Sequence, residues 1–523
     1  MTDAFGELTS ATNGAGQTTG YGYSADGRVI SITYPLPSTA TWAPSDTVSY
    51  GYDYADLLTS VTDFNGHAIT ITNTDDGLLS GETLGSTGDT ISATFDSTDA
   101  PSAIMLENGS STLQSFTYSD APSGSILSET DTPSSPQSPA DYTYDAQGRV
   151  TSMAPGSGST LSYGFDPSGN LSPLPNGASA TYDKAGELTS TTLSGTTTGF
   201  AYNSDGERLS ATQGGTTISS GTWNGAGQLT SYTDPVASMT AATYDGNGLR
   251  ASANAGAATQ NFVWDNASQT PQLIMDSNNA YIFGGSTAPA EQVSLLSGEI
   301  SYLIADSLGS VRGSVNSSGS LTKTTSYDAW GNPETSGGLT TATPFGYAGG
   351  YTDADGLIYL VNRYYDPATG QFISVDPAIS QTAEPYAYAD GNPISNADPT
   401  GECSWWSKRC WEFWVLRGAL YAGAVAFAGL VDWFCDDVTA GACGIINGVI
   451  FRSAVASAGA IVTCWWFRWC SGFWQYFGTG VTTFLVTLFY GGLRMVFTRP
   501  AKLAAFRFWV VWHYVRLVDY FRL

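Results

Sequence analysis

Polar and apolar positions alternate in short runs rich in serine and threonine over most of the first four hundred residues. Alternation with a period of two is typical of strands with one buried face. The runs are punctuated by a recurring unit: an aromatic residue, usually Asp or Asn next, Gly four positions after the aromatic, then a Ser/Thr-rich strand. Clear copies are YDAQGRVT from Tyr144 and YDKAGELT from Tyr182, and looser copies begin at Tyr23, Phe165, Tyr202, Trp223, Tyr244, Trp264 and Tyr327.

Each unit predicts a β-hairpin. The Asp or Asn side chain accepts local backbone N–H bonds, and the Gly supplies the positive φ that reverses the chain. From Tyr144 to Trp264 the aromatic recurs about every twenty residues. One hairpin cannot bury its apolar face alone, so we expect successive units to stack side by side in one continuous sheet.

These units resemble the YD repeats of the RHS family, which includes bacterial polymorphic toxins, C components of insecticidal toxin complexes and animal teneurins. The resemblance covers roughly residues 20–401 and implies a spiral, hollow β-shell. The closing stretch is similar to the RHS repeat-associated core, through the segments GYAGGY (346–351), NRYYDP (362–367), GQFISVDP (370–377) and DPTG (398–401). The expected domains are therefore a shell over residues 1–340, a core over 341–401 and a tail over 402–523.

In relatives that process themselves, the core is an aspartic autoprotease that cuts at the end of its terminal Asp-Pro-x-Gly-Leu. Carried over by motif, the resemblance implies Asp366 and Asp376 as the catalytic carboxylates, Arg363 as their charge partner, and cleavage near Gly401 and Glu402. Two carboxylates that share one proton let one activate water while the other protonates the substrate. Glu402 stands where self-cleaving relatives have Leu, and the alternative is that both aspartates only accept turn hydrogen bonds.

Charge separates the tail from the rest. Residues 401–523 hold 11 Lys and Arg against 6 Asp and Glu, although the whole chain has a formal net charge of −27. Because phosphate binding needs basic groups, the acidic body is not expected to bind nucleic acid.

The tail is rich in tryptophan and long apolar runs. Residues 469–493 carry no formal charge and are long enough for a membrane-spanning helix. Residues 506–516 mix aromatic and basic side chains, as interfacial helices do. We therefore expect a small, mainly α-helical, membrane-associated domain, with membrane contacts at Trp469, Trp474, Leu485, Leu493, Trp509 and Trp512. The alternative is a domain, enclosed by the shell or soluble, whose apolar segments bury one another.

All six cysteines lie in the tail, at Cys403, Cys410, Cys435, Cys443, Cys464 and Cys470. Their even number fits disulfides in an oxidising compartment, and free thiols in a reducing one fit equally well. With two histidines in the chain, no zinc pattern of Cys and His is present, and we expect no metal and no cofactor. The first residues show no signal peptide.

Two functions compete at this point. The first is a polymorphic-toxin protein, secreted or at the cell surface, whose shell carries a membrane-active effector, with an upstream delivery module and an immunity protein as partners. The second is a surface or wall-associated adhesion scaffold with the tail as its membrane anchor. Apart from the autoprotease, no enzymatic motif is visible, since the tail has one histidine and no phosphate-binding Gly loop.

Overall fold

The computed structural model describes residues 1–402 except 4, 257, 269 and 335–336. The chain divides into two compact units, Met1–Trp411 and Glu412–Leu523, and every described residue belongs to the first. The expected helical tail, with its cysteines and membrane contacts, lies outside the described residues apart from Glu402.

The turns of the repeat form as the sequence predicts. In the unit at Tyr144, the Oδ1 atom of Asp145 accepts hydrogen bonds from the backbone N–H groups of Gln147 (2.9 Å) and Arg149 (3.0 Å). Gly148 has a φ of 83°, a conformation that costs glycine little because it has no Cβ. The predicted hairpin is confirmed at this unit, down to the roles of the Asp and the Gly.

In several units, the aromatic residue that opens the turn forms a hydrogen bond to an earlier unit. The Tyr244 hydroxyl donates to the carbonyl of Leu229 (2.7 Å), and the Trp223 indole N–H donates to that of Arg208 (3.0 Å). An aromatic ring with a polar tip can bury its body in the sheet while satisfying a backbone acceptor. This explains why the repeat prefers Tyr and Trp at this position.

The described residues form four sheets, and the strands of each are hydrogen-bonded in chain order. The first sheet has fourteen strands: β1 (Ser10–Thr12), β2 (Thr18–Tyr23), β3 (Val29–Thr33), β4 (Thr47–Tyr52), β5 (Leu58–Thr62), β6 (Ala68–Asn73), β7 (Leu79–Thr83), β8 (Thr90–Phe95), β9 (Pro101–Asn108), β10 (Ser111–Asp120), β11 (Ile126–Thr132), β12 (Ala140–Tyr144), β13 (Val150–Ala154) and β14 (Leu161–Ser162). The second has nine: β15 (Ser179–Tyr182), β16 (Leu188–Leu193), β17 (Thr196–Tyr202), β18 (Arg208–Gln213), β19 (Thr216–Trp223), β20 (Leu229–Thr233), β21 (Ser238–Tyr244), β22 (Arg250–Ala255) and β23 (Ala258–Asn261).

The third sheet has seven strands: β24 (Val263–Asp265), β25 (Gln272–Met275), β26 (Asn279–Phe283), β27 (Pro289–Ser294), β28 (Ile300–Ala305), β29 (Val311–Asn316) and β30 (Leu321–Thr324). The fourth comprises β31 (Tyr351–Thr352), β32 (Ile358–Leu360), β33 (Arg363–Asp366) and β34 (Gln371–Phe372). The helices within the described residues are short: η2 (Leu339–Thr341), η3 (Tyr347–Gly349), α1 (Ile379–Thr382) and η4 (Ala389–Gly391). The predicted mainly β, antiparallel array is confirmed.

The expectation of one continuous sheet is wrong. The ladder stops after β14 and resumes at β15, and the intervening segment contains Pro173 and Pro175. Proline has no N–H to donate to a ladder, so two of them close together interrupt strand pairing. The sheet therefore ends near these prolines, although the aromatic residues continue at regular spacing.

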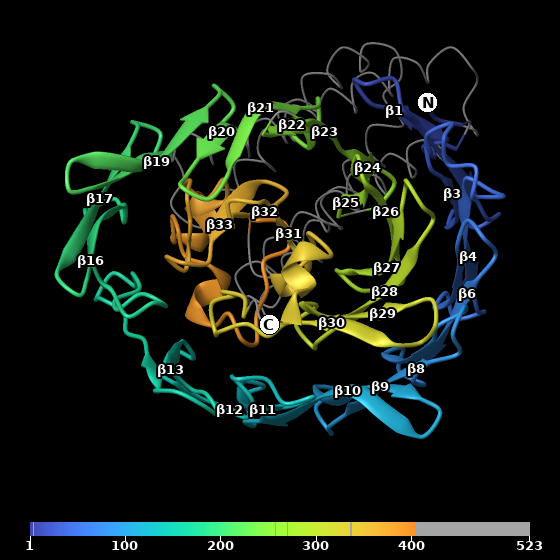
Figure 1. Ribbon diagram of the computed structural model, residues 1–523, viewed down its shortest axis with the longest axis horizontal. Helices are drawn as coiled ribbons and strands as arrows, with labels where there is room; N and C mark the ends of the chain where they lie inside the picture. Colours follow the sequence, from blue (N-terminus) through green and yellow to red (C-terminus); the bar gives the residue numbers. More distant parts are fainter. Residues whose placement is uncertain (4, 257, 269, 335–336, 403–523) are drawn as a thin grey trace, which may run out of the picture. The chain divides into compact units, whose positions relative to one another are not determined.

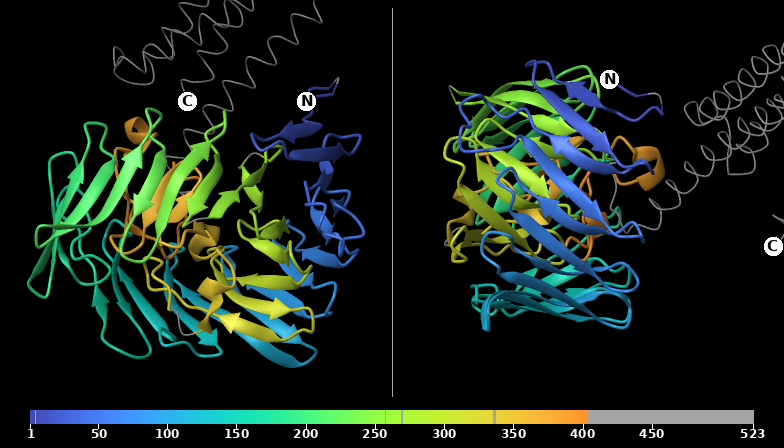
Figure 2. Two further views of the ribbon diagram at one scale, coloured as in Figure 1. Left: turned by 45° about the horizontal axis from the view of Figure 1, so that its top comes forward. Right: turned by 90° about the vertical axis from the view of Figure 1, so that its right-hand side faces the viewer.

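The sheets are arranged in two layers. Figure 1 shows β1–β23 following a curved outer wall, with β24–β30 turning inside it and β31–β33 further in, and Figure 2 shows the same wall from two other directions. Hydrogen bonds join the layers: the Tyr34 hydroxyl donates to the Tyr281 carbonyl (2.9 Å), and the Gln114 side-chain amide to the Arg312 carbonyl (3.1 Å). The largest apolar cluster draws its side chains from both layers, including Val48 and Val61 of the wall and Tyr302 and Val311 of the inner sheet.

Candidate active site at the end of the core

Arg363 is the centre of the candidate site. It is the first residue of β33, its side chain is 2% exposed, and its guanidinium lies 3.5 Å from the centre of the Phe372 ring. A buried cation is stable only where nearby acids compensate for lost hydration. Here Asp398 lies 3.2 Å and Asp376 3.8 Å from the Nη2 atom of Arg363. Both carboxylates are almost fully buried.

The last described residues fold back onto this arginine. The Gly401 carbonyl accepts a hydrogen bond from the Nε atom of Arg363, and the Glu402 backbone N–H donates to the Oδ1 atom of Asp398 (3.2 Å). Gly401 has a φ of 66°, and a Cβ there would lie 2.6 Å from the Leu360 carbonyl oxygen. Glycine at this position is therefore needed for the close approach of the chain end to β32 and β33.

Burial shapes the protonation of the cluster. Desolvation raises the pKa of Asp376, while Arg363 and a 2.7 Å hydrogen bond from the Thr382 hydroxyl act in the opposite direction. Burial also lowers the pKa of Arg363, although Asp376 and Asp398 favour its charged form. One buried cation facing two buried carboxylates leaves an excess negative charge, which a single shared proton would neutralise.

Asp366 lies elsewhere in the core. Its Oδ2 atom contacts Nη1 of Arg208 on β18 at 2.7 Å and accepts a hydrogen bond from Thr369 (2.8 Å). Asp366 therefore joins the core to the outer wall, and Asp376 faces a different arginine. The sequence predicted one site made of Arg363, Asp366 and Asp376. The structure brings Asp376 to Arg363, but it brings Asp398 there in place of Asp366.

The sequence alone does not single out Asp398 as the second carboxylate. Three Asp-Pro pairs end the core, at Asp366, Asp376 and Asp398, and nothing local distinguishes them. The distinction comes from the return of residues 398–402 to β33, where Asn362 also donates its backbone N–H to the Thr400 carbonyl (3.1 Å). A contact between residues 35 apart in the chain depends on tertiary folding.

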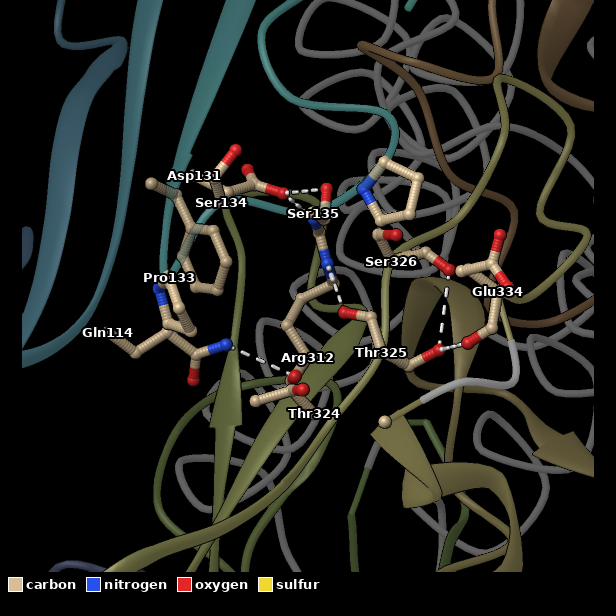
Figure 3. A pocket seen from close by; sticks show the side chains of 13 residues that line it. Gln114, Asp131, Pro133, Ser134, Ser135, Arg312, Thr324, Thr325, Ser326 and Glu334 are labelled. Carbon is tan, nitrogen blue, oxygen red and sulfur yellow. Dashed lines mark hydrogen bonds and ion pairs between the residues drawn. The ribbon is translucent and has the colours of Figure 1, made fainter. Parts of the chain in front are cut away.

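A second buried arginine occupies a polar pocket between the layers, shown in Figure 3. Arg312 of β29 contacts Glu129 (2.8 Å), Asp131 (2.8 Å) and Asp306 (3.0 Å), and its Nε atom donates to the Thr325 carbonyl. Burial raises the pKa of Glu129 to about 7, against the effect of Arg312. Because Arg312 lies on the inner sheet and Glu129 and Asp131 lie on β11 of the wall, we interpret this cluster as a link between layers.

The described part of the chain contains neither a metal-binding cluster nor a membrane-spanning helix. Over residues 1–402, apart from the few positions that are not described, no three His, Cys, Asp or Glu side chains are grouped so that they could hold a metal ion. Within that same part of the chain, no helix is long and apolar enough to cross a bilayer. The apolar run at residues 469–493 lies outside it.

Comparison with known families identifies the fold. A family model described as Teneurin YD-shell matches residues 89–394, and one described as RHS Repeat matches residues 3–39. The first match spans more than half of the chain. This chain belongs to the YD-shell family. The resemblance to RHS and YD repeats seen in the sequence is thereby confirmed.

Similar curated proteins are much longer than this chain. The tRNA3(Ser)-specific nuclease WapA of Bacillus spizizenii is 29% identical over 282 residues, which cover 51% of this chain and 11% of the relative. The tRNA nuclease WapA of Bacillus subtilis is 28% identical over the same length. Double-stranded DNA deaminase toxin A of Burkholderia cenocepacia is 29% identical over 168 residues, 28% of this chain and 12% of the relative. The matched part of this YD-shell protein thus corresponds to 11% or 12% of the length of these relatives.

Solved structures show the same fold. The crystal structure of TcdB2-TccC3-Cdc42 superimposes with a TM-score of 0.53 at 19% identity, covering 73% of this chain and 21% of that one. A Photorhabdus luminescens Tc holotoxin pore structure gives a TM-score of 0.54 at 19% identity, covering 75% and 21%. At this level of identity the likeness concerns the fold.

Proposed function

We propose that this YD-shell protein is a toxin-type carrier whose core cuts its own chain near Gly401 and Glu402 and so releases the tail as an effector. The observation that supports this is the arrangement at Arg363. Two buried carboxylates, Asp376 and Asp398, flank one guanidinium, and the backbone of residues 401–402 lies against them. A carboxylate pair that holds one proton is the arrangement that activates water against an amide.

The first experiment follows the size of the purified protein. At the mean residue mass of this chain, 55.0 kDa over 523 residues, a cut near residue 402 gives a tail fragment of about 13 kDa. The variant Asp376→Asn should keep the chain intact on a denaturing gel. The variant Asp366→Asn is the matched control, because Asp366 contacts Arg208 and should leave cleavage in place wherever circular dichroism shows a folded sheet.

A wild-type band that stays at full length in folded protein would contradict the release. Cleavage that Asp366→Asn abolishes and Asp376→Asn leaves unchanged, both variants being folded, would contradict the proposed carboxylate pair.

We further propose that the released tail acts on membranes. Eleven of the 15 tryptophans follow Gly401, and residues 469–493 form an uncharged run of spanning length. The named activities of the relatives, tRNA cleavage and DNA deamination, belong to those proteins, and the tail here has little of the chemistry that a nuclease or deaminase needs. An immunity protein and an upstream delivery module would then be the expected partners, at a secreted or surface location.

The test of the effector is inducible expression of residues 402–523, with and without a fused signal peptide, while membrane potential is recorded. Depolarisation would support a membrane effector. Growth and potential that remain unchanged in both forms would contradict it, and loss of surface attachment on deleting the tail would instead favour the adhesion scaffold.

A further inference from the structure

Two buried carboxyl groups meet where the inner sheet packs on the wall. Asp63 follows β5 of the wall and is 4% exposed, and Glu291 lies on β27 of the inner sheet and is 1% exposed. Their side chains form a hydrogen bond with each other. Among the described residues, neither forms an ion pair with Lys or Arg, and the ring of His67 is the basic group beside Asp63. The pair therefore differs from the Arg312 cluster, where a guanidinium compensates the acids.

The turn that contains Asp63 makes this residue a hydrogen-bond acceptor. Its Oδ1 atom accepts the backbone N–H groups of Asn65 (2.9 Å) and His67 (2.7 Å), and its Oδ2 atom lies 3.0 Å from the Nδ1 atom of His67. The same geometry recurs in the turns of the repeat, where Asp side chains accept local N–H bonds. Because an ionised carboxylate can only accept, the hydrogen bond between the two acids needs a proton on Glu291.

The surroundings of Glu291 do not compensate a negative charge. Its Oε1 atom is buried and has no hydrogen-bond partner among the described residues. Burial raises the pKa of Glu291 well above 4.5, and the charge of Asp63 and the hydrogen bond to it act in the same direction. The titratable groups that Glu291 itself influences are two phenols, Tyr302 on β28 and Tyr34 on the wall. Burial raises the pKa of both, and the charge of Glu291 adds to this effect.

We propose that Asp63 and Glu291 form a proton-operated latch between the wall and the inner sheet, closed while Glu291 carries its proton and loosened once that proton is lost. The proposal is independent of autoproteolysis and concerns how the two layers separate. With the proton in place, a hydrogen bond joins the layers. Without it, two buried negative charges face each other and the Glu291 carboxylate has neither water nor a cation to stabilise it.

The direction of the pH dependence follows from the burial of Glu291. Its pKa in the folded protein lies well above the ordinary value of 4.5, so the stability that it contributes is full below about pH 4.5 and is lost as the pH rises through the folded pKa. The contact is therefore tight in acidic surroundings and weak in alkaline ones. Because the latch lies at one contact, β27 and the turn at residues 63–67 should open locally before the sheets unfold.

Hydrogen exchange of the full-length protein tests the latch. Protection of the amides in β27, β28 and residues 63–67 is compared at about pH 6 and about pH 9, after correction for the pH dependence of exchange in unfolded peptides. In wild type it should fall about 10-fold or more, since each unit of pKa shift is a factor of ten in the opening equilibrium.

Glu291→Gln is the decisive variant. Its side-chain amide can donate to Asp63 at every pH, so protection in these segments should change much less than in wild type. The comparison isolates the latch, because Glu82 and Glu129, whose pKa values burial raises to about 7, remain in both proteins.

Two further variants separate the latch from a general effect of charge. Glu299→Gln is the matched control, because Glu299 is an exposed acid in the connection between β27 and β28, and it should keep the wild-type pH dependence. Asp63→Asn keeps an acceptor oxygen and adds an N–H that ionised Glu291 can accept. Its loss of protection at about pH 9 should therefore be smaller than that of wild type. Circular dichroism checks that each variant retains the β signal.

The outcomes decide the proposal in either direction. Protection that wild type and Glu299→Gln lose on going to about pH 9, and that Glu291→Gln keeps, supports the latch. Wild-type protection that is the same at both pH values overturns it. So does a folded Glu291→Gln protein that loses protection as wild type does. If Glu291→Gln does not fold, Asp63→Asn decides, and a loss equal to that of wild type overturns the latch.

Discussion

Removing the charge of Arg312 tests how the inner sheet is held to the outer wall. Arg312 lies on β29, and two of its three carboxylate partners, Glu129 and Asp131, lie on β11 of the wall. The third, Asp306, follows β28. The side chain of Arg312 is 5% exposed, so Arg312→Met would leave three buried acids without the cation that compensates them.

The expected loss of unfolding free energy is large. Breaking a buried ion pair by removing one partner costs about 3–5 kcal/mol, because the remaining charge is left without compensation. The control is Arg28→Met, which removes a partly exposed arginine that pairs with the exposed Asp26 and Asp56. Pairs of that kind contribute about 0–1 kcal/mol.

The loss should depend on pH. The pKa of Glu129 is about 7 in the folded protein, raised by burial, against 4.5 as its ordinary value. The folded state therefore keeps a proton that the unfolded chain releases, and the stability contributed by Glu129 is full below about pH 4.5 and is lost as the pH rises through about 7. Without Arg312 the pKa of Glu129 rises further. Arg312→Met should therefore be more destabilised at about pH 8 than at about pH 5.5.

Urea unfolding followed by circular dichroism of the β signal provides the measurement. The midpoints of wild type, Arg312→Met and Arg28→Met are compared at both pH values. The reasoning is refuted if Arg312→Met loses no more stability than Arg28→Met, or if its loss is the same at both pH values.

Three further predictions concern the turn at the chain end, the repeat and the pH dependence of cleavage. Gly401→Ala should slow cleavage on a gel time course while the sheet signal is kept, because its Cβ would lie 2.6 Å from the Leu360 carbonyl oxygen; cutting at the wild-type rate would contradict the described geometry. Tyr182→Phe removes the 2.6 Å hydrogen bond to the Leu171 carbonyl and should cost about 1 kcal/mol in urea unfolding, and an unchanged midpoint would show that this bond does not stabilise the array. Cleavage should slow as the pH rises, because the carboxylate pair must keep one proton and burial raises the pKa of Asp376; a rate that increases steadily with pH would exclude a shared proton.

The repeat shows which structural features the local sequence determines. The unit at Tyr144 contains its own turn acceptor, Asp145, and its own left-handed residue, Gly148, so its hairpin follows from contacts within a few residues. The antiparallel array and the family followed from that unit. The end of the first sheet also has a local cause, the prolines at 173 and 175. The prediction of one continuous sheet relied on the regular aromatic spacing and did not take these prolines into account.

The sequence by itself determined the hairpins, their order and the residues able to carry acid chemistry at the end of the core, because turn geometry and strand alternation depend on near neighbours. Only the tertiary structure decided which carboxylates share an arginine. Asp366 contacts Arg208, 158 positions away, while Asp398 and Gly401 return to Arg363 over 35 and 38 positions. Such partners are selected by the packing of the core against the wall and by the need to compensate each buried guanidinium, and neither condition is expressed in the spacing of residues along the chain.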